Sequence, residues 1–286
     1  MKMNNLHEIK RLEDIAFLIR KELVKLASQV TIHIGGDLSA VDILTVLWQN
    51  VMQYDIHNSK WEYRDRFILS KGHCSAAVAF NQAQLGCYDV SDIFEEYATD
   101  NCRFSMSPCR HTNQFYESSA TGSLGQGLPI AVGMAAALKA KKNTKSKVYV
   151  LLGDGELQEG SNWEAVMYAS QICLDNIVAI IDNNGLQFDG ETKNINHIDD
   201  AGKRFAAFGW DTYSIDGHKI DQLLCVFEKI KKQKSPVLIE AHTVKGKGVN
   251  FMENNYLWHA GKITEKQLDE AISSIHKMYG ERIKNV

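Results

Sequence analysis

Two short apolar runs, separated by a segment of helical length, stand out along the chain. Residues 148–152 and 177–181 are continuous stretches of apolar side chains, and each ends in small or oxygen-bearing residues. The segment between them, 156–173, is predicted to be helical. Two such strands around a helix form a βαβ unit with parallel strands. The pattern therefore predicts an α/β fold whose ligands bind at the carboxyl ends of the strands.

The same reasoning divides the rest of the chain into elements. Apolar residues at steps of three and four predict a helix over 6–28. After a loop at 31–36, helices are predicted to begin at Asp37, to follow the strand at 65–69 through Leu85, and to cover 128–142, 219–232 and 264–284, the last at the periphery. Further strands are predicted within 205–216 and over 236–241.

Composition excludes several classes of protein. The 286 residues carry a formal net charge of −3, which gives no electrostatic case for nucleic acid or an anionic membrane. No apolar run reaches membrane-spanning length, and the N-terminus lacks the apolar core of a secretory signal. The six cysteines show no spacing typical of zinc sites. A cytoplasmic protein with reduced thiols is expected.

The polar ends of the two apolar runs have complementary chemistry. Gly153 and Gly155 allow the backbone to approach a phosphate closely, and Asp154 and Asn184 offer one charged and one neutral oxygen. Mg²⁺ prefers hard oxygen ligands, and substrate phosphates often complete its shell. The two strand ends therefore predict a diphosphate held through Mg²⁺. The alternative is a tight turn followed by a polar loop.

Histidines also fall at places where a cleft is expected. His33 comes directly before a Gly-Gly pair and a helix start, so it either points into a cleft or is a surface or capping residue. His73 follows the predicted strand at 65–69. For Lys71, just before it, a solvated surface position and a place in the site are both open. His218 is predicted to be a turn residue.

Five motifs in order resemble the thiamine-diphosphate-dependent transketolases, in particular their N-terminal half. They are the Gly-rich segment with His33, Ser70-Lys71-Gly72-His73, the loop 119–127 with Thr121-Gly122-Ser123-Leu124-Gly125-Gln126-Gly127, Gly153-Asp154-Gly155-Glu156-Leu157-Gln158-Glu159-Gly160 with Asn184, and Lys245-Gly246-Lys247-Gly248 with Trp258-His259. The resemblance implies a three-layer αβα fold with a mostly parallel sheet. It also implies that 1–286 form a single diphosphate-binding domain.

The resemblance further implies a set of site residues for thiamine diphosphate bound with Mg²⁺ or Ca²⁺. The implied metal ligands are Asp154, Asn184 and the carbonyl of Leu186. The implied cofactor contacts are His73, Gly122, Ser123, Leu124, Asp154, Gly155, Glu159, Asn184, Lys245 and His259. The implied catalytic residues are His33, His73, His111, His259 and Glu159, the last as a buried carboxylate at a subunit contact.

One part of the sequence departs from the family pattern. Transketolases usually place a His-Pro pair upstream of the Thr121 loop, and Ser107-Pro108 stands there in this chain, with His111 three residues on. Either His111 replaces that histidine through a shifted loop, or the site lacks it. This histidine normally faces the sugar, so the departure concerns substrate identity and leaves cofactor binding unaffected.

A full transketolase is much longer than this chain and adds a pyrimidine-binding and a C-terminal domain. The resemblance therefore implies an N-terminal subunit that transfers a two-carbon ketol unit from a ketose or its phosphate to an aldehyde acceptor. It would act only with a partner subunit that carries the other domains, in an α2β2 heterotetramer. The alternatives are another carbon–carbon bond enzyme with the same cofactor and a 2-oxo-acid donor, or a non-catalytic cofactor-binding subunit.

Overall fold

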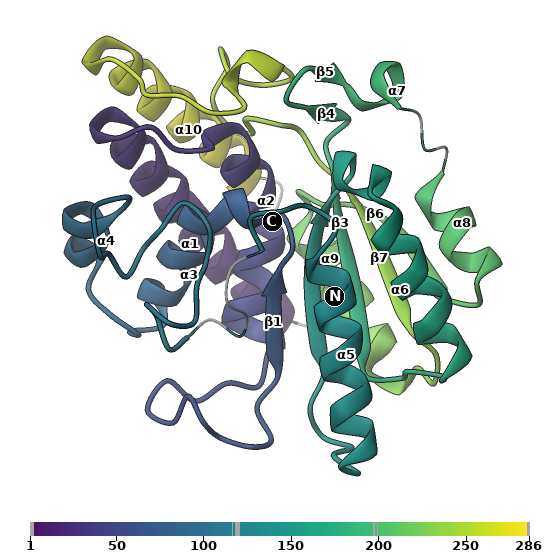
Figure 1. The fold of residues 1–286 in the computed structure, drawn as a ribbon. Coiled ribbons are helices and arrows are strands. Elements are labelled where there is room, and N and C mark those ends of the chain that lie inside the picture. Colours follow the sequence, from purple (N-terminus) through teal and green to yellow (C-terminus); the bar gives the residue numbers. More distant parts are fainter. Residues whose placement is uncertain (1–2, 116, 118–120, 197, 199, 285–286) are drawn as a thin grey trace.

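The computed structural model describes residues 3–115, 117, 121–196, 198 and 200–284. A sheet of parallel strands, in the order β1-β2-β3-β7-β6, has helices on both faces (Figure 1). Its strands are β1 (Arg66–Leu69), β2 (Val148–Gly153), β3 (Ile177–Asn183), β6 (Asp211–Asp216) and β7 (Val237–His242); β4 (Leu186–Gln187) and β5 (Gly190–Glu191) pair separately. The predicted αβα arrangement with a parallel sheet is confirmed.

The helices match most of the predicted segments. They are α1 (Met3–Gln29), α2 (Ile34–Val46), α3 (Ser75–Gln84), α4 (Val90–Glu96), α5 (Gly127–Ala140), α6 (Gly160–Gln171), α7 (Thr192–Ile195), α8 (Ala201–Ala207), α9 (Ile220–Lys229) and α10 (Glu265–Ile283). A π-helical turn (Leu47–Val51) continues α2. None of the described helices is both long and apolar enough to cross a membrane.

Alternate residues of the central strands face two separate cores. On β2, Val148, Val150 and Leu152 pack in one cluster with α5, α6 and α8. Tyr149 and Leu151 pack in the other, with α1, α2, α3 and α9. Because both faces of a parallel sheet are covered, its strands need apolar side chains at successive positions. This is why the strands are continuous apolar runs in the sequence.

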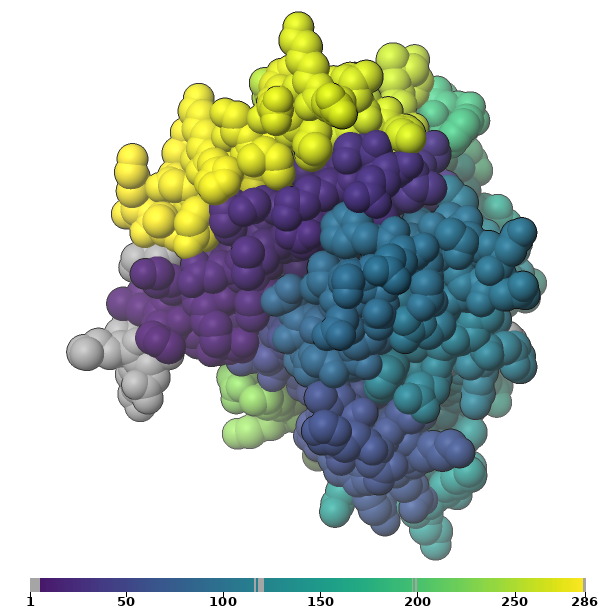
Figure 2. Space-filling model, turned by 90° about the vertical axis from the view of Figure 1, so that its left-hand side faces the viewer, coloured from purple at the N-terminus to yellow at the C-terminus, as the bar shows by residue number. Residues whose placement is uncertain are grey.

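The C-terminal helix α10 is more than a peripheral element, contrary to expectation. It lies against α1 along the molecular surface, where the two ends of the chain run side by side (Figure 2). Ala271 and Ile275 of α10 are fully buried and belong to the same core cluster as α1. The helix therefore closes one layer of the fold.

Helix α2 begins three residues earlier than predicted, at Ile34 instead of Asp37. The carbonyl of His33 accepts the N–H groups of Gly36 and Asp37, both at 3.1 Å, so the Gly-Gly pair lies within the first turn. A Cβ on Gly35 would lie 2.4 Å from the carbonyl oxygen of Trp258. The glycine there is explained by the close approach of another loop.

The single helix predicted over 156–173 is two elements. A 3₁₀ turn, Gly155–Gln158, is followed by Glu159 in an extended conformation (φ −75°, ψ 126°), and α6 starts only after it. The side-chain amide of Asn162 donates to the carbonyl of Glu156 at 2.7 Å and stabilises this break. Because of this break, Glu156 is buried and Glu159 is exposed in the single chain.

A buried charge cluster joins α1, α2 and α10. Asp42 accepts hydrogen bonds from Arg20 (2.9 and 2.6 Å) and from Arg282 (2.9 and 3.0 Å). His218, in the turn after β6 as predicted, contacts the same carboxylate through Nδ1 at 2.8 Å. Burial by itself would raise the pKa of Asp42, but the two guanidinium groups outweigh it and hold that pKa well below its ordinary value. Asp42 is therefore an anion that holds three elements together.

We expect Asp42→Asn to lower the free energy of unfolding by about 3–5 kcal/mol, because it leaves the buried guanidinium of Arg20 without its counter-charge and that of Arg282 with Glu13 alone. Urea denaturation at pH 7 measures the change. Since the folded-state pKa is depressed, this contribution is present above the carboxyl's ordinary pKa and is lost as the pH falls below it. Exposed Glu228→Gln is the control and should change stability by no more than about 0.5 kcal/mol. A loss under about 1 kcal/mol in Asp42→Asn would contradict the prediction.

Candidate active site

A cavity of about 380 Å³ opens where the carboxyl ends of the parallel strands meet. It is lined by residues from several segments that are far apart in the sequence. Those predicted as site residues are His73, Leu124, Asp154, Gly155, Asn184, Leu186, Lys245 and His259. The cavity thus unites four of the five motifs, and the fifth reaches it through Gly36. Strand ends of a parallel sheet are the expected place for such a site.

A buried ion pair forms the floor of the site. Lys71 donates to the carboxylate of Asp182, and both side chains are almost inaccessible to water. The same carboxylate accepts from Ser39 at 2.5 Å and from Thr243. Burial would raise the pKa of Asp182, but Lys71 outweighs it, so that pKa lies below its ordinary value. The alternative that Lys71 is a solvated surface charge is wrong.

Three oxygen donors lie together at the ends of β2 and β3. The carboxylate of Asp154 accepts from the Thr192 hydroxyl at 2.8 Å. The side-chain oxygen of Asn184 accepts from the Leu186 N–H at 3.1 Å. The carbonyl of Leu186 accepts from Lys245 at 3.3 Å. A carboxylate, an amide and a carbonyl are hard oxygen donors of the kind that Mg²⁺ and Ca²⁺ prefer.

The donor set leaves room for phosphate oxygens in a metal shell. Among the described residues no group of three or more His, Cys, Asp or Glu side chains is placed to hold a metal by itself. Burial raises the pKa of Asp154, and a neighbouring cation would favour its charged form. The residues therefore suit a metal ion that receives its other ligands from a bound phosphate.

Three histidines face one another beside the cavity. The ring centroids of His33 and His73 are 5.4 Å apart, those of His33 and His259 5.5 Å, and those of His73 and His259 5.2 Å. Burial lowers the pKa of all three, the charge of Lys245 lowers it further, and that of Lys71 adds to the effect on His73 and His259. The pKa of His259 falls to about 3. Near neutral pH all three imidazoles are therefore uncharged.

Lys245 is the cation closest to this histidine group. Its Nζ lies 2.9 Å from Nδ1 of His259. Burial, together with the charge of Lys71, lowers the pKa of Lys245 to about 8. The loop that carries it turns at Gly246 (φ +78°), where a Cβ would lie 2.4 Å from the carbonyl oxygen of Met252. Only glycine suits this turn, which explains the Gly/Lys alternation in the sequence.

Glu156 is a buried residue of the site that the sequence analysis missed. Its carboxylate accepts from the Ser70 hydroxyl and from the N–H groups of Gly125 (2.9 Å) and Gly153 (3.1 Å). It therefore joins three of the motifs in one place. Glu159, expected at a subunit contact, lies on the surface of the single chain, because the backbone is extended there and α6 starts after it. The only signal for Glu156 was its place inside the Gly153–Gly160 string.

The loop around Gly122 is only partly enclosed. Gly122 and Ser123 are exposed, whereas the Leu124 side chain reaches the cavity. Thr121 is buried and donates to the carbonyl of Leu69, which anchors the loop to the end of β1. Ser119 and Ala120, which the sequence analysis also assigned to this loop, lie outside the described residues.

His111 is not brought to the cavity. It lies exposed in a turn and is absent from the lining. Ser107 is closer to the motifs: its hydroxyl oxygen would be 2.8 Å from a Cβ on Gly72 and 3.5 Å from one on Gly122. The geometry therefore places Ser107, and not His111, at the edge of the candidate site.

Comparison with known proteins identifies the family of this chain. The family model described as "Transketolase, thiamine diphosphate binding domain" matches residues 15–282. The chain is 39% identical over 260 residues to one of the separate subunits of the apulose-4-phosphate transketolase of Phocaeicola vulgatus, with 90% of each protein covered. It is 38% identical over 248 residues to the 6-deoxy-6-sulfo-D-fructose transketolase subunit SqwG of a Clostridium species, covering 86% of this chain and 88% of that one.

Longer relatives match over part of their length. Human transketolase is 35% identical over 244 residues, which are 85% of this chain and 38% of that protein. The crystal structure of Campylobacter jejuni transketolase superposes with a TM-score of 0.83 at 28% identity, covering 99% of this chain and 46% of that one. The chain therefore spans less than half of the solved transketolase it resembles and nearly the full length of the separate subunits. The chain belongs to the transketolase family, in which it corresponds to the thiamine diphosphate binding domain.

Proposed function

We propose that this chain is the N-terminal subunit of a split transketolase, in which a second polypeptide supplies the pyrimidine-binding and C-terminal domains. The observation that carries the proposal is the convergence of Asp154, Asn184, Leu186 and Lys245 on one cavity. Two relatives of similar length bear the names of subunits, which supports a partner chain. An α2β2 assembly is proposed with it. Six unpaired cysteines support a reducing cytoplasm as its location.

The residues at the strand ends fit thiamine diphosphate and a divalent cation. Asp154, Asn184 and the Leu186 carbonyl would hold Mg²⁺ or Ca²⁺, and Lys245 and His73 would face the diphosphate. A Cβ on Gly153 would meet nothing within 4 Å, which leaves open space at the end of β2, and a Cβ on Gly155 would lie 2.7 Å from the Gln187 side-chain oxygen, so glycine lets the backbone pass there. Gly122, Ser123 and Leu124 would contact the aminopyrimidine ring, and Glu159 the partner.

Thiamine diphosphate, when bound, supplies an electron sink for cleaving a carbon–carbon bond beside a carbonyl. The histidines of this chain would hold and move protons near the reacting carbonyl. Because Lys245 donates to Nδ1 of His259, the proton of that neutral ring lies on Nε2. His33 and His73 are neutral too, and a neutral imidazole both donates and accepts a proton near pH 7.

The names of the relatives restrict the class of donor substrate more than the cofactor alone does. Relatives named for apulose 4-phosphate and for 6-deoxy-6-sulfo-D-fructose favour a ketose donor over a 2-oxo acid. The proposed reaction is transfer of a two-carbon ketol unit from such a ketose, or its phosphate, to an aldehyde. A catalytic role for His111 is not supported by its exposed position.

Reconstitution tests the split-enzyme proposal. We expect the purified chain to show little ketol transfer from xylulose 5-phosphate to ribose 5-phosphate, because one side of the site is open. Addition of the polypeptide encoded next to it should produce activity at least about a hundredfold higher. A coupled spectrophotometric assay of glyceraldehyde 3-phosphate measures both. Full activity of the chain alone would refute the split arrangement.

Substitution of Asp154 tests the metal and diphosphate assignment. In the complex with the partner, Asp154→Ala should raise the dissociation constant of thiamine diphosphate with Mg²⁺ at least about a hundredfold, equivalent to about 2.7 kcal/mol. The loss follows from removing the charged metal ligand. Isothermal titration calorimetry measures it. Asp269→Asn, an exposed carboxylate on α10, is the control and should bind normally. Unchanged binding by Asp154→Ala would contradict the assignment of Asp154 as a metal ligand.

The pH dependence of the histidine group is a further test. The folded-state pKa values of His33, His73 and His259 are lowered, so the folded chain binds fewer protons than the unfolded chain below the ordinary histidine pKa. Stability should therefore fall as the pH falls from about 6.5, towards about 3 for His259. Nuclear magnetic resonance of the imidazole groups should show His73 and His259 neutral at pH 6, and His33 titrating below its ordinary pKa. Protonation of His73 or His259 at that pH would contradict this expectation.

A further inference from the structure

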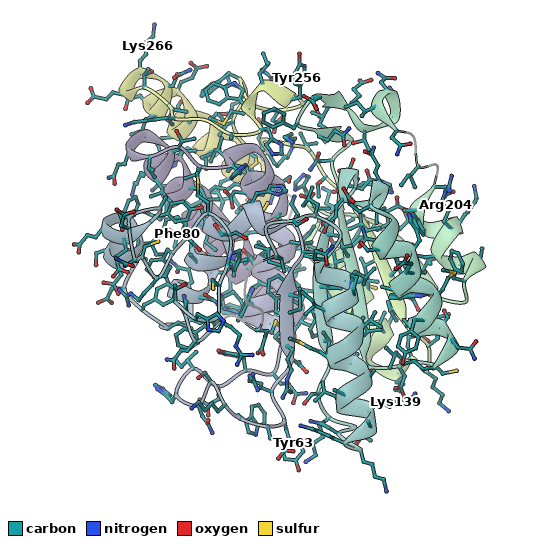
Figure 3. The ribbon with its side chains drawn as sticks, viewed as in Figure 1. Tyr63, Phe80, Lys139, Arg204, Tyr256 and Lys266 are labelled. Atoms are coloured by element: carbon teal, nitrogen blue, oxygen red, sulfur yellow. The ribbon has the colours of Figure 1, made fainter. Side chains whose placement is uncertain are left out.

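Lysines are concentrated near the amino ends of the strands, at the end of the sheet opposite the candidate active site. Five lysines fall within 139–147 and four within 229–234, in a chain whose net charge is −3. These segments lie where α5 and α9 end and β2 and β7 begin (Figure 1). Figure 3 shows Lys139 and Tyr63 at this end of the molecule and Tyr256 and Lys266 at the other. A chain with a negative total charge thus presents a local positive surface.

A cavity of about 490 Å³ lies between the two lysine-rich segments. Such a volume is in the range that small ligands occupy. Its charged lining residues are Asp65, Lys139, Lys142, Lys145, Lys147, Asp175 and Lys231. Most of these charges are therefore positive. None of these residues lines the cavity of the candidate active site.

The two carboxylates of the lining do little to neutralise these lysines. Asp65 accepts the backbone N–H groups of Gln53 (2.8 Å) and Lys147 (2.7 Å), so both of its oxygens are already bonded. Asp175 lies 3.9 Å from the ammonium of Lys139, a long and exposed pair. Asp65 therefore binds backbone N–H groups, and Asp175 pairs with Lys139.

In the described part of the chain three lysines of the lining make no ion pair, although the charges of Asp65 and Asp175 attract that of Lys147. Among the residues the structure describes, no carboxylate oxygen lies within 4 Å of the ammonium groups of Lys142, Lys145 or Lys147. Lys145 instead stands over the ring of Tyr63, 4.9 Å from its centroid. Burial lowers the pKa of Lys147. An anion in the cavity would oppose that shift, so the lysines and an anionic ligand would stabilise each other.

Neutral polar side chains also line the cavity. They include Gln53, Thr144 and Gln233. Amide and hydroxyl groups of this kind can form hydrogen bonds with the hydroxyl groups of a ligand. Asn176 lines the cavity as well, and its side-chain amide donates to the carbonyl of Ala135 at 2.9 Å.

We propose that this cavity is a second binding site, for a small phosphorylated molecule that carries hydroxyl groups. Its phosphate would lie against Lys142, Lys145 and Lys147, and its hydroxyl groups would contact polar side chains of the lining such as Gln53, Thr144 and Gln233. A recessed cavity of this volume suits a small molecule better than a nucleic-acid backbone or a membrane surface. The site is separate from the strand ends that carry Asp154 and Asn184, and it does not depend on their proposed role.

Amide chemical shifts of the full chain, titrated with ribose 5-phosphate and with inorganic phosphate, test the proposal. Ribose 5-phosphate should shift the signals of Thr144, Ser146 and Asn176 saturably at millimolar concentration, and bind more tightly than phosphate because of its hydroxyls. Added salt should weaken both. Shifts confined to Gly153 and Gly155 would assign the phosphate to the strand ends alone and overturn the proposal.

A charge-reversed double variant, Lys142→Glu with Lys145→Glu, provides the matched comparison. It should weaken ribose 5-phosphate binding at the cavity at least about tenfold. Lys266→Glu, which makes the same charge change at the opposite end, should bind normally (Figure 3). Thermal unfolding checks that each variant is folded. Equal binding by all variants would overturn the proposal, as would cavity shifts caused by an RNA oligonucleotide or phosphatidylserine vesicles and not by ribose 5-phosphate.

Discussion

The buried ion pair between Lys71 and Asp182 is the contact on which the candidate active site depends. Removing two charges from water costs several kcal/mol for each, and only a complete set of partners offsets it. Asp182 finds those partners in Lys71, Ser39 and Thr243, which belong to the loop after β1, to α2 and to the segment after β7. Because a displaced loop would leave a buried charge unpaired, the strand ends keep one arrangement. Asp154 and Asn184 are held on either side of it.

The charge that remains in the site determines what it can bind. Lys71 is matched by Asp182, whereas the hydrogen-bond partners of Lys245 in the described part of the chain are the Leu186 carbonyl and the neutral ring of His259. Burial, together with the charge of Lys71, lowers the pKa of Lys245 to about 8, and burial also keeps the histidines uncharged. The phosphate oxygens of a bound diphosphate would supply a counter-charge for Lys245. The electrostatics of the strand ends thus favour an anionic ligand.

Much of the fold and of the site could be predicted because both follow from local patterns. Strands buried on both faces are continuous apolar runs, and the polar residues after them fall at one edge of the sheet; Asp154 and His73 were found in this way. Asp182 was not, because nothing in the sequence separates it from its polar neighbours until its burial is known. Glu156 was missed for a similar reason. Helical periodicity does not reveal a 3₁₀ turn followed by an extended residue.

Part of the candidate site is exposed in this chain. Phe188 is 67% exposed and Ile195 45%, although both line the cavity, and Glu159 and Gly122 are exposed as well. Developing charge is stabilised most strongly by fixed dipoles in a water-excluded site. This chain supplies the dipoles, the charges and the histidines, but it leaves one wall open to solvent. Whether the covering wall is a later domain of the same chain or a separate polypeptide changes no contact within this half, so fused and divided relatives can share its site.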